Sequence, residues 1–387
     1  MQVKPKLLVT ASTFPRWEGD TEPRFILDLS KALLEYYDVT VLAPAYPGAK
    51  TKEVLEGVKV IRYHYFPIHK WETLCYPGAI VPRIKEKKIR ALLVPFLFIC
   101  LYFNLIRLSK GFDKIHAHWL IPQGIVQSFI NKKYIVTGHG GDVVSLNKGI
   151  LKKLKIRCLK RAEKITVVSE ALKSKVKELY PAADVSVISM GCDTSKFGKQ
   201  YHKENYFNQD GKKVILFVGR LAEKKGVTYL IDAMESIDGK LVIVGDGPLR
   251  ESLEEQAQKY GNKIEFWGSK SHQELREIYA SADIFVAPSI TAKDGDSEGI
   301  PTTIMEALAS GLPVIGSDSG GISEILEDGY NGFLVSERDV SGLSQKILML
   351  IESDEIKTKL SEHGMKTVLS RDYHNIAWEY QRVLGGN

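Results

Sequence analysis

Cysteine is scarce and scattered in this sequence. The four cysteines, at positions 75, 100, 158 and 192, form no Cys-x-x-Cys pair and have no histidine beside them at metal-ligand spacing. This arrangement argues against a disulfide framework and a zinc site, and it fits a reducing cytoplasm. The composition also lacks the bias of collagen, coiled coils or disordered chains, since 44% of the residues are hydrophobic and 26% are charged.

A long uninterrupted apolar segment is missing as well. The most apolar run, 91–106, has 16 residues and contains Pro95, whereas a helix needs about 20 residues to cross a bilayer. We therefore expect a buried helix here rather than a membrane span. The segment 1–10 holds too short an apolar stretch for a signal peptide, so the sequence predicts a cytoplasmic protein.

The length and the order of apolar patterns predict two domains. A chain of 387 residues has room for two domains of about 100 to 200 residues each. Runs rich in valine and isoleucine alternate with amphipathic stretches, and they predict strands at 6–10, 39–43, 58–63, 114–118, 134–138, 165–168 and 185–188, and again at 213–218, 241–244, 264–266, 284–287, 314–316 and 333–335. Because parallel strands need crossover helices, this alternation predicts an α/β fold with two doubly wound, mainly parallel sheets.

A polar segment without a clear period separates the two series of strands. It covers about 194–211, so we predict a first domain at 1–190, a linker at 191–212 and a second domain at 213–370. The remaining segment, 371–387, has apolar residues at helical spacing and predicts a closing amphipathic helix.

Positive charge is concentrated in the first half. The net charge of the chain is +6, but residues 1–190 carry 31 basic and 16 acidic residues, a net charge of +15, and the remainder carries −9. The basic residues gather at 83–90 and at 148–177, where 151–161 has the spacing of a helix with its lysines on one side. Such a surface favours contact with anionic lipid or a phosphorylated acceptor, and a solvated helix face is the alternative. No nucleic-acid-binding motif accompanies the charge, so we expect no nucleic-acid partner.

Two glutamates bracket the start of a predicted helix in the second half. The segment 297–316 reads SEGIPTTIMEALASGLPVIG, in which a proline suits the first helical turn and a glycine ends the helix before a strand. Glu298 then lies in the loop ahead of the helix, and Glu306 lies one to two turns inside it. Between them is the helix N-terminus, whose free N–H groups and dipole favour an anion, at Gly299, Ile300, Pro301 and Thr302. A sugar nucleotide fits this order of groups, and two exposed carboxylates without a ligand are the alternative.

Two basic residues follow the strand predicted at 213–218. Arg220 and Lys225 stand where that strand ends and a helix begins. Ligands of open α/β sheets bind outside the carboxyl ends of the strands, and arginine and lysine pair well with phosphate oxygens. We therefore predict that this strand end binds a diphosphate. Gly245-Asp-Gly247 follows the next strand and is short of a full dinucleotide fingerprint, which leaves an NAD-dependent oxidoreductase as a weaker alternative.

These residues resemble the signature of family 4 glycosyltransferases, which are retaining enzymes of the GT-B architecture. The signature has two glutamates separated by seven residues, matched by Glu298 and Glu306, and Gly-Arg and Lys-Gly pairs, matched at 219–220 and 225–226. Three segments of the first half also resemble family segments in the expected order, at 12–20, 115–119 and 137–142. The resemblance covers most of the chain and implies two Rossmann-like domains facing across a cleft, with the closing helix packed back on the first domain.

The resemblance also implies roles on the donor side. Arg220 and Lys225 would hold the diphosphate, Glu306 the ribose hydroxyls and Glu298 the transferred sugar. His139 matches a histidine that lies in the cleft against the donor sugar, so His139 and Glu298 are the candidate catalytic residues.

Three residues of the first half are candidates for binding the acceptor, and they are Asp20, His118 and Asp142. Asp20 follows Gly19 where many family members have paired glycines, so this loop departs from the family pattern. Asp142 and His118 are candidates for binding or deprotonating the acceptor hydroxyl.

The sequence as a whole predicts a retaining, metal-independent hexosyltransferase that moves a sugar from a nucleoside diphosphate sugar to a hydroxyl acceptor, in glycolipid, polysaccharide or glycan synthesis. A sugar-nucleotide epimerase on the same architecture is the alternative. We expect no cofactor and no metal, because cationic side chains and a helix N-terminus already neutralise the diphosphate; Asp294-Gly-Asp296 resembles a metal-binding DxD, but a flexible loop is the favoured interpretation. We expect a lipid-linked or otherwise anionic acceptor and peripheral contact with the cytoplasmic membrane face.

Overall fold

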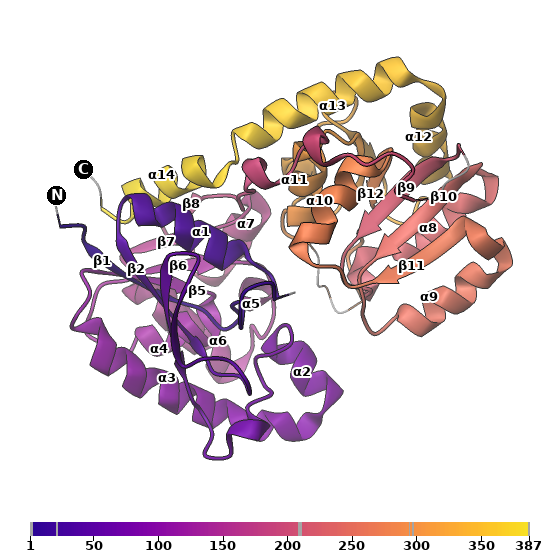
Figure 1. The fold of residues 1–387 in the computed structure, drawn as a ribbon. Coiled ribbons are helices and arrows are strands. Elements are labelled where there is room, and N and C mark those ends of the chain that lie inside the picture. The colour runs from indigo at the N-terminus through magenta and orange to yellow at the C-terminus, as the bar shows by residue number, and fades with distance from the viewer. Residues whose placement is uncertain (1–2, 21, 208–210, 294, 296–297, 386–387) are drawn as a thin grey trace. The chain divides into compact units, whose positions relative to one another are not determined.

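The computed structural model describes residues 3–20, 22–207, 211–293, 295 and 298–385 (Figure 1). The chain divides into two compact units, a first unit of Met1–Ser189 with Tyr373–Asn387 and a second unit of Met190–Asp372. The segment predicted as a linker belongs to the second unit, because it contains Phe197 and Phe207, which are buried in that unit's core. Its short 3₁₀ helices are η5 (Thr194–Lys196) and η6 (Lys199–Tyr201).

The first unit is built on a sheet of eight strands. They are β1 (Lys6–Thr10), β2 (Asp38–Pro44), β3 (Lys52–Leu55), β4 (Val58–Tyr63), β5 (Lys114–His118), β6 (Ile135–Gly138), β7 (Lys164–Val167) and β8 (Val185–Val187). Their order is β3-β4-β2-β1-β5-β6-β7-β8, and every neighbouring pair is parallel except β3 with β4. The antiparallel edge strand β3 was not predicted from the sequence. Lys52–Leu55 has only four residues, starts with two charged ones and buries only Leu55, so it lacks the apolar run by which the other strands were recognised.

Helices cover the sheet of the first unit. They are α1 (Phe25–Ala32), α2 (Ile80–Glu86), α3 (Val94–Ser109), α4 (Ile125–Gln127), α5 (Gly141–Val144), α6 (Gly149–Arg161), α7 (Glu170–Leu179) and α14 (Tyr373–Val383), with the shorter helical segments η1 (Leu33–Glu35), η2 (His69–Trp71), η3 (Lys88–Leu93) and η4 (Leu120–Gly124). The closing helix α14 packs against α1, and it buries Ile376, Ala377 and Tyr380 in the core of the first unit.

The most apolar segment of the chain is less buried than its composition predicts. Lys88–Ser109, which joins η3 and α3, is long and apolar enough to cross a membrane by length and composition, yet only 28% of its apolar segment is buried. Leu97, Leu101 and Leu105 face the core, whereas Phe96, Ile99 and Phe103 on the other side are exposed. The prediction of a buried helix is therefore correct for one side of α3 and wrong for the other.

One lysine of α6 departs from the predicted solvent-facing position. Lys155 is fully buried and donates hydrogen bonds to the carbonyl oxygen of Val143 at 3.1 Å and to Asn147 Oδ1 at 2.7 Å. Lys152 and Lys153 are exposed, as predicted. The helix thus turns one of its cations inward, because the loop before it supplies oxygen atoms that compensate for desolvation.

The second unit contains a sheet of six parallel strands. They are β9 (Lys213–Val218), β10 (Gly239–Val244), β11 (Ile264–Gly268), β12 (Ile284–Ala287), β13 (Val314–Ser317) and β14 (Phe333–Val335). Their order is β11-β10-β9-β12-β13-β14, so the winding direction reverses between β9 and β12. The prediction of an α/β fold with two doubly wound, mainly parallel sheets is confirmed.

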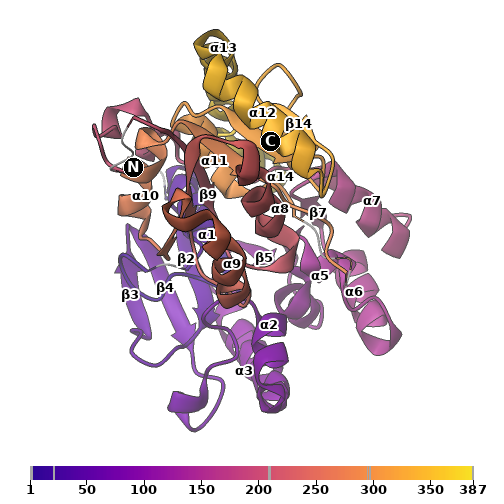
Figure 2. The same cartoon turned by 90° about the vertical axis from the view of Figure 1, so that its right-hand side faces the viewer.

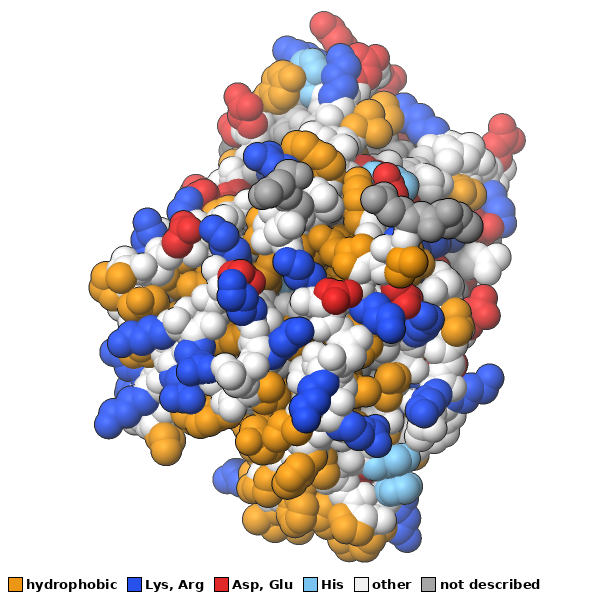
Figure 3. All heavy atoms as spheres, turned by 90° about the vertical axis from the view of Figure 1, so that its left-hand side faces the viewer, with side chains coloured by type: hydrophobic (Ala, Val, Ile, Leu, Met, Phe, Trp, Pro, Cys, Tyr) orange, Lys and Arg blue, Asp and Glu red, His pale blue; other side chains and the backbone are white. Residues whose placement is uncertain are grey.

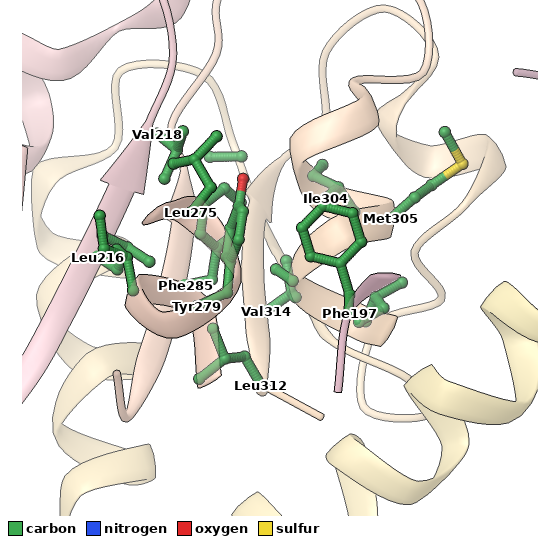
Figure 4. Close-up of a cluster of buried hydrophobic side chains, with 14 of the residues drawn as sticks. Phe197, Leu216, Val218, Leu275, Tyr279, Phe285, Ile304, Met305, Leu312 and Val314 are labelled. Atoms are coloured by element: carbon green, nitrogen blue, oxygen red, sulfur yellow. The ribbon is translucent and has the colours of Figure 1, made fainter. Parts of the chain in front are cut away.

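The helices of the second unit lie on both faces of this sheet. They are α8 (Val227–Ala233), α9 (Arg250–Ala257), α10 (His272–Ser281), α11 (Thr302–Ala309), α12 (Val340–Glu352) and α13 (Asp354–Leu369), with the 3₁₀ segments η7 (Glu223–Lys225), η8 (Met234–Ser236), η9 (Gln258–Lys263) and η10 (Ile322–Glu324). Figure 4 shows Ile304 and Met305 of α11 in the same apolar cluster as Leu216 of β9 and Phe285 of β12. This packing fixes α11 at the sheet.

Candidate active site

The loops that follow β9 and β12 meet at the point where the sheet of the second unit reverses its winding. The N–H of Ile290 donates a hydrogen bond of 2.8 Å to the carbonyl oxygen of Lys224. Gly226 has a positive φ of 62°, and a Cβ there would overlap the carbonyl oxygen of Pro288. Glycine is therefore required for the two loops to approach each other, and the approach brings Lys225 to the switch point where ligands of such sheets bind.

The glycines at 245 and 247 serve the same loop. The N–H of Gly219 donates to the carbonyl oxygen of Val244 at 2.9 Å, and a Cβ on Gly245 would overlap the carbonyl oxygen of Gly219. A Cβ on Gly247 would likewise overlap the carbonyl oxygen of Leu221. This close approach is between two protein backbones, so Gly245-Asp-Gly247 supports the loop that carries Arg220 rather than marking a dinucleotide site.

Glu298 lies against two lysines. Its carboxylate is 3.3 Å from Nζ of Lys224 and 3.2 Å from Nζ of Lys225, and its side chain is 11% exposed. Burial acts to raise the pKa of Glu298, but the charges of Lys225 and Lys224 lower it below its ordinary value. Glu298 is thus an anion that orients two cations at the end of β9, where Arg220 is exposed to solvent.

A glycine pair that the sequence analysis missed holds the Glu298 backbone in place. The N–H of Gly321 donates to the carbonyl oxygen of Glu298 at 3.1 Å. Gly320 has a positive φ of 58°, and a Cβ there would overlap the same carbonyl oxygen. The signal that could have found this pair is its position shortly after β13 (Val314–Ser317), at another carboxyl strand end.

Helix α11 carries the second glutamate. The helix begins at Thr302 after Pro301, and its N-terminus follows β12, so it lies at the carboxyl edge of the sheet. Glu306 Oε2 accepts a hydrogen bond of 2.9 Å from the hydroxyl of Tyr279, a residue that the sequence analysis missed. Burial, followed by the charge of Glu306, raises the pKa of Tyr279 well above its ordinary value, so this hydroxyl stays a donor. Ile300 and Pro301 are buried, while Gly299 and Thr302 are half-buried.

His139 lies at the end of β6 in the first unit. Its Nε2 is 2.9 Å from Nδ1 of His118, so one imidazole donates and the other accepts. The rings of Phe25 and Trp119 lie 5.3 and 5.0 Å from its own. Burial lowers the pKa of His139 to about 3 and the pKa of His118 well below its ordinary value, so both rings are neutral at neutral pH.

Asp142 shapes the loop that carries His139. Its Oδ1 accepts hydrogen bonds of 3.0 Å from the N–H groups of His139 and Gly140, and its Oδ2 accepts one of 2.7 Å from the N–H of Leu120. Burial raises the pKa of Asp142, and these three bonds oppose the rise. The carboxylate is therefore engaged by backbone, and its role toward an acceptor stays a prediction.

Asp20 is engaged by an arginine. Its two oxygens accept hydrogen bonds of 2.9 and 2.6 Å from the Arg16 side chain, whose guanidinium also lies over the rings of Trp17 and Tyr46. Burial acts to raise the pKa of Asp20, but the bonds from Arg16 lower it overall. Its role toward an acceptor also stays a prediction.

The histidines connect to the closing helix through a chain of polar groups that the sequence analysis missed. His116 packs against His118 with ring centroids 4.0 Å apart, and its Nε2 is 2.7 Å from Oγ1 of Thr137. The hydroxyl of Tyr380, on α14, lies 3.4 Å from the same oxygen. Residues from three segments that are distant in the sequence, β5, β6 and α14, thus meet near His139, an arrangement that no local pattern reveals.

The predicted site residues fall into two groups, one in each unit. In the second unit the structure brings Lys225 into contact with Glu298, while Arg220 lies at the end of β9 and Glu306 on α11. In the first unit it brings together His118, His139 and Asp142, whereas Asp20 bonds to Arg16 instead. Asp294 and Asp296 lie outside the described residues. Within the described part of the chain, no group of three or more His, Cys, Asp or Glu residues is arranged to hold a metal ion.

A strand-end loop with cations, an adjacent helix N-terminus and a doubly wound sheet define a protein that binds phosphorylated ligands. Comparison with known families narrows this class. Residues 23–196 match the family model described as Glycosyltransferase Family 4, and residues 199–367 match the model described as Glycosyl transferases group 1. The chain belongs to the family 4 glycosyltransferases, and the prediction of a glycosyltransferase is confirmed.

Individual relatives agree with this assignment. The chain is similar to an uncharacterized glycosyltransferase, MJ1178, of Methanocaldococcus jannaschii, with 30% identity over 320 residues that cover 81% of this chain and 86% of the relative. It is also similar to TuaC of Bacillus subtilis, a putative teichuronic acid biosynthesis glycosyltransferase, with 31% identity over 270 residues that cover 66% of each chain. These matches favour sugar transfer over the epimerase and oxidoreductase alternatives.

Solved structures share the fold. Sucrose-phosphate synthase from Thermosynechococcus elongatus has a TM-score of 0.79 at 20% identity, over 98% of both chains. HepE from Anabaena, in complex with UDP-glucose, has a TM-score of 0.74 at 19% identity, over 98% of this chain and 99% of that one. The fold of two Rossmann-like domains is thus that of GT-B glycosyltransferases.

Proposed function

We propose that the protein transfers a sugar from a nucleoside diphosphate sugar to a hydroxyl acceptor, with retention at the anomeric carbon, in polysaccharide, glycolipid or glycan synthesis. The observation that carries the donor assignment is the contact of Glu298 with Lys224 and Lys225 at the switch point of the second sheet. A fixed carboxylate beside two cations and a helix N-terminus suits a ligand that joins hydroxyl groups to a diphosphate. The UDP-glucose in HepE supports the same donor class.

In this proposal the second unit stabilises the leaving group. Arg220 and Lys225 bind the diphosphate, together with the N–H groups at the start of α11, while Glu298 binds a hydroxyl of the transferred sugar. Glu306, held by Tyr279, accepts hydrogen bonds from the ribose. The bond between the anomeric carbon and the diphosphate oxygen breaks, and the acceptor oxygen bonds to that carbon on the same face. The acceptor proton passes to a phosphate oxygen of the leaving group.

The charges needed for this step belong to the protein. Preorganised cations and a helix N-terminus stabilise negative charge that develops on the leaving diphosphate. We therefore propose transfer that needs neither a metal nor a cofactor. His139 contributes as a neutral hydrogen-bonding group, because its pKa of about 3 keeps it uncharged. His118, Asp142 and Asp20 remain the proposed acceptor residues.

We also propose a cytoplasmic protein that binds the membrane peripherally and uses a lipid-linked or otherwise anionic acceptor. The net charge of +15 on residues 1–190 supports this, since those residues form most of the unit that would hold the acceptor. The exposed lysines of α6 contribute to that charge, whereas Lys155 does not face solvent.

A thermal-shift screen with UDP, GDP and ADP tests the donor assignment. A nucleotide that binds the folded protein raises its apparent melting temperature, so one of the three should stabilise the protein clearly more than the others. Nucleoside diphosphate sugars with the same base are then supplied as donors together with candidate acceptors, and the anomeric configuration of the product is determined by NMR. No stabilisation by any of the three, or a product with inverted configuration, contradicts the proposal.

A further inference from the structure

A row of large apolar side chains on η3 and α3 faces solvent. Its members recur every three or four residues and are each between 36% and 73% exposed; they are Ile89, Leu92, Phe96, Ile99, Phe103 and Ile106. We call these six residues the α3 row. At about 1.5 Å per helical residue, the row extends over about 26 Å. The fold does not need this side of the helix, because Leu97, Leu101 and Leu105 on the opposite side supply the packing.

The apolar surface continues into the preceding loop. Phe66 contacts Phe96 edge to face, with ring centroids 5.0 Å apart, and it also stacks with Trp71 at 5.9 Å. Trp71 is itself exposed. Figure 3 shows apolar side chains gathered at the lower end of this face, with lysine and arginine side chains around them. A continuous apolar surface of this extent marks an interaction site in a soluble protein.

Both ends of the row carry positive charge. Residues 87–112 contain five basic residues and no acidic one. Lys87 and Lys88 are exposed before the row, and Arg107 and Lys110 are exposed at its end. Helix α2, which precedes Lys87, is joined to α3 through η3 and contacts that segment (Figure 2). The surface is therefore an apolar row with cations at both ends.

This combination identifies the occupant. A second copy of the chain, paired through the same row in either direction, would bring basic ends against basic ends. An anionic bilayer complements both features, since its acyl region takes the apolar side chains and its phosphates take the cations. Tryptophan also favours the boundary between lipid and water, which suits Trp71.

We propose that the α3 row inserts into the surface of an anionic bilayer, with α3 lying parallel to the membrane. The helix lies on the bilayer and does not cross it, because Leu97, Leu101 and Leu105 on its other side are fully buried where α3 packs against α4 and β4. The inference deepens the membrane contact of the proposed function: insertion of apolar side chains is the main interaction, and the lysines assist it.

Flotation with vesicles tests the insertion. The full chain should bind vesicles of equal parts phosphatidylglycerol and phosphatidylcholine, and bind weakly to phosphatidylcholine alone. Ile99→Gln with Phe103→Gln should reduce binding by about tenfold or more, because two large apolar side chains lose their burial. Leu369→Gln with Trp378→Gln is the matched control, since it removes two exposed apolar side chains from α13 and α14, and its binding should stay unchanged.

A second measurement locates the row in the membrane. Phe103→Trp keeps the site apolar, and its added fluorescence should be quenched by vesicles that contain brominated lipid, whereas the added fluorescence of Leu369→Trp should not. Three results would overturn the proposal: no binding of the unsubstituted protein to anionic vesicles, equal binding of the Gln pair, or a lipid-free dimer that the Gln pair abolishes, which would identify a second copy as the occupant. Binding of nucleoside diphosphate by the same preparations separates failure of the membrane proposal from failure of the donor assignment.

Discussion

The two units have the same kind of sheet but place different chemistry at the carboxyl ends of its strands. In the second unit, Glu298 contacts Lys224 and Lys225, and tightly packed loops hold all three. In the first unit the strand ends carry His118 and His139, which burial keeps neutral. The strand ends of the second unit are thus charged, and those of the first unit carry neutral hydrogen-bonding groups.

The charge of the first unit lies elsewhere. Its basic excess is on exposed helices, among them α6 with Lys152 and Lys153, and not at the strand ends that carry the histidines. Net charge alone therefore did not locate a binding site in that unit. It indicates a surface for a polyanion such as a membrane, and the α3 row gives that surface its apolar component.

The largest expected effect is on the charged strand ends. Lys225→Ala should lower the turnover number by about 100-fold to 1,000-fold, because it removes a fixed cation from the place where charge develops on the leaving diphosphate. Lys259→Ala, an exposed lysine after α9, is the control and should retain full activity. Steady-state kinetics with the nucleotide sugar measures both. Equal activity of the two variants would show that Lys225 is not part of the donor site. The contrast between charged strand ends in the second unit and neutral ones in the first would then have no role in the reaction.

The tight packing of the second unit can be tested with two glycines that both have a positive φ. Gly320 and Gly329 have φ values of 58° and 74°, but a Cβ would overlap the Glu298 carbonyl oxygen at Gly320 and meet nothing within 4 Å at Gly329. Gly329→Ala should cost about 1 kcal/mol of unfolding free energy from backbone strain alone, and Gly320→Ala about 2 to 3 kcal/mol. Hydrogen exchange of the strands of the second unit measures the difference. Equal losses would mean that the loop after β13 adapts without cost.

The sequence predicted the two sheets for physical reasons, whereas the donor-side roles stay a prediction, although the structure brings Lys225 into contact with Glu298. Buried parallel strands consist of local runs rich in valine and isoleucine, so they can be recognised from the sequence. The segment that contains Glu298 and Glu306 is likewise continuous along the chain. The contact of Tyr279 with Glu306 could not be predicted, because the two residues are distant in the sequence. For Gly320 the sequence offered a position after a strand, but not its contact with the backbone of Glu298, which forms only on folding. The exposure of Phe103 was missed for a related reason: composition gives the apolarity of a helix but not which of two apolar sides the core will use.

The neutral histidines of the first unit predict a dependence of stability on pH. In the unfolded chain a histidine binds a proton below about pH 6.5, whereas the pKa of His116 and of His139 in the folded unit is about 3. The unfolded state therefore binds more protons in this range, and each histidine removes about 1.4 kcal/mol of stability for every pH unit that the pH falls below 6.5. His139→Gln should make the decline less steep. The slope of unfolding free energy against pH is measured by urea unfolding at several values between about pH 4 and pH 7, with hydrogen exchange reporting on the first unit. The same slope in His139→Gln and in the unsubstituted protein would show that burial does not keep His139 neutral.

The smallest expected effect is that of removing metal ions with a chelator. This experiment tests the cations of the second unit by removing any metal ion rather than a side chain. If Lys225, Arg220 and the N-terminus of α11 together neutralise the leaving diphosphate, a divalent ion adds little to the stabilisation that they already provide. Sugar transfer should then continue at its original rate in excess EDTA. The informative comparison is with Lys225→Ala, because a variant that lacks one cation has the most to gain from an added one. If magnesium or manganese leaves the activity of the unsubstituted enzyme unchanged but partly restores the activity of Lys225→Ala, the result supports an electrostatic role for this lysine. If EDTA abolishes transfer completely and manganese restores it, a metal has that role instead, and Asp294 and Asp296 become the residues to test.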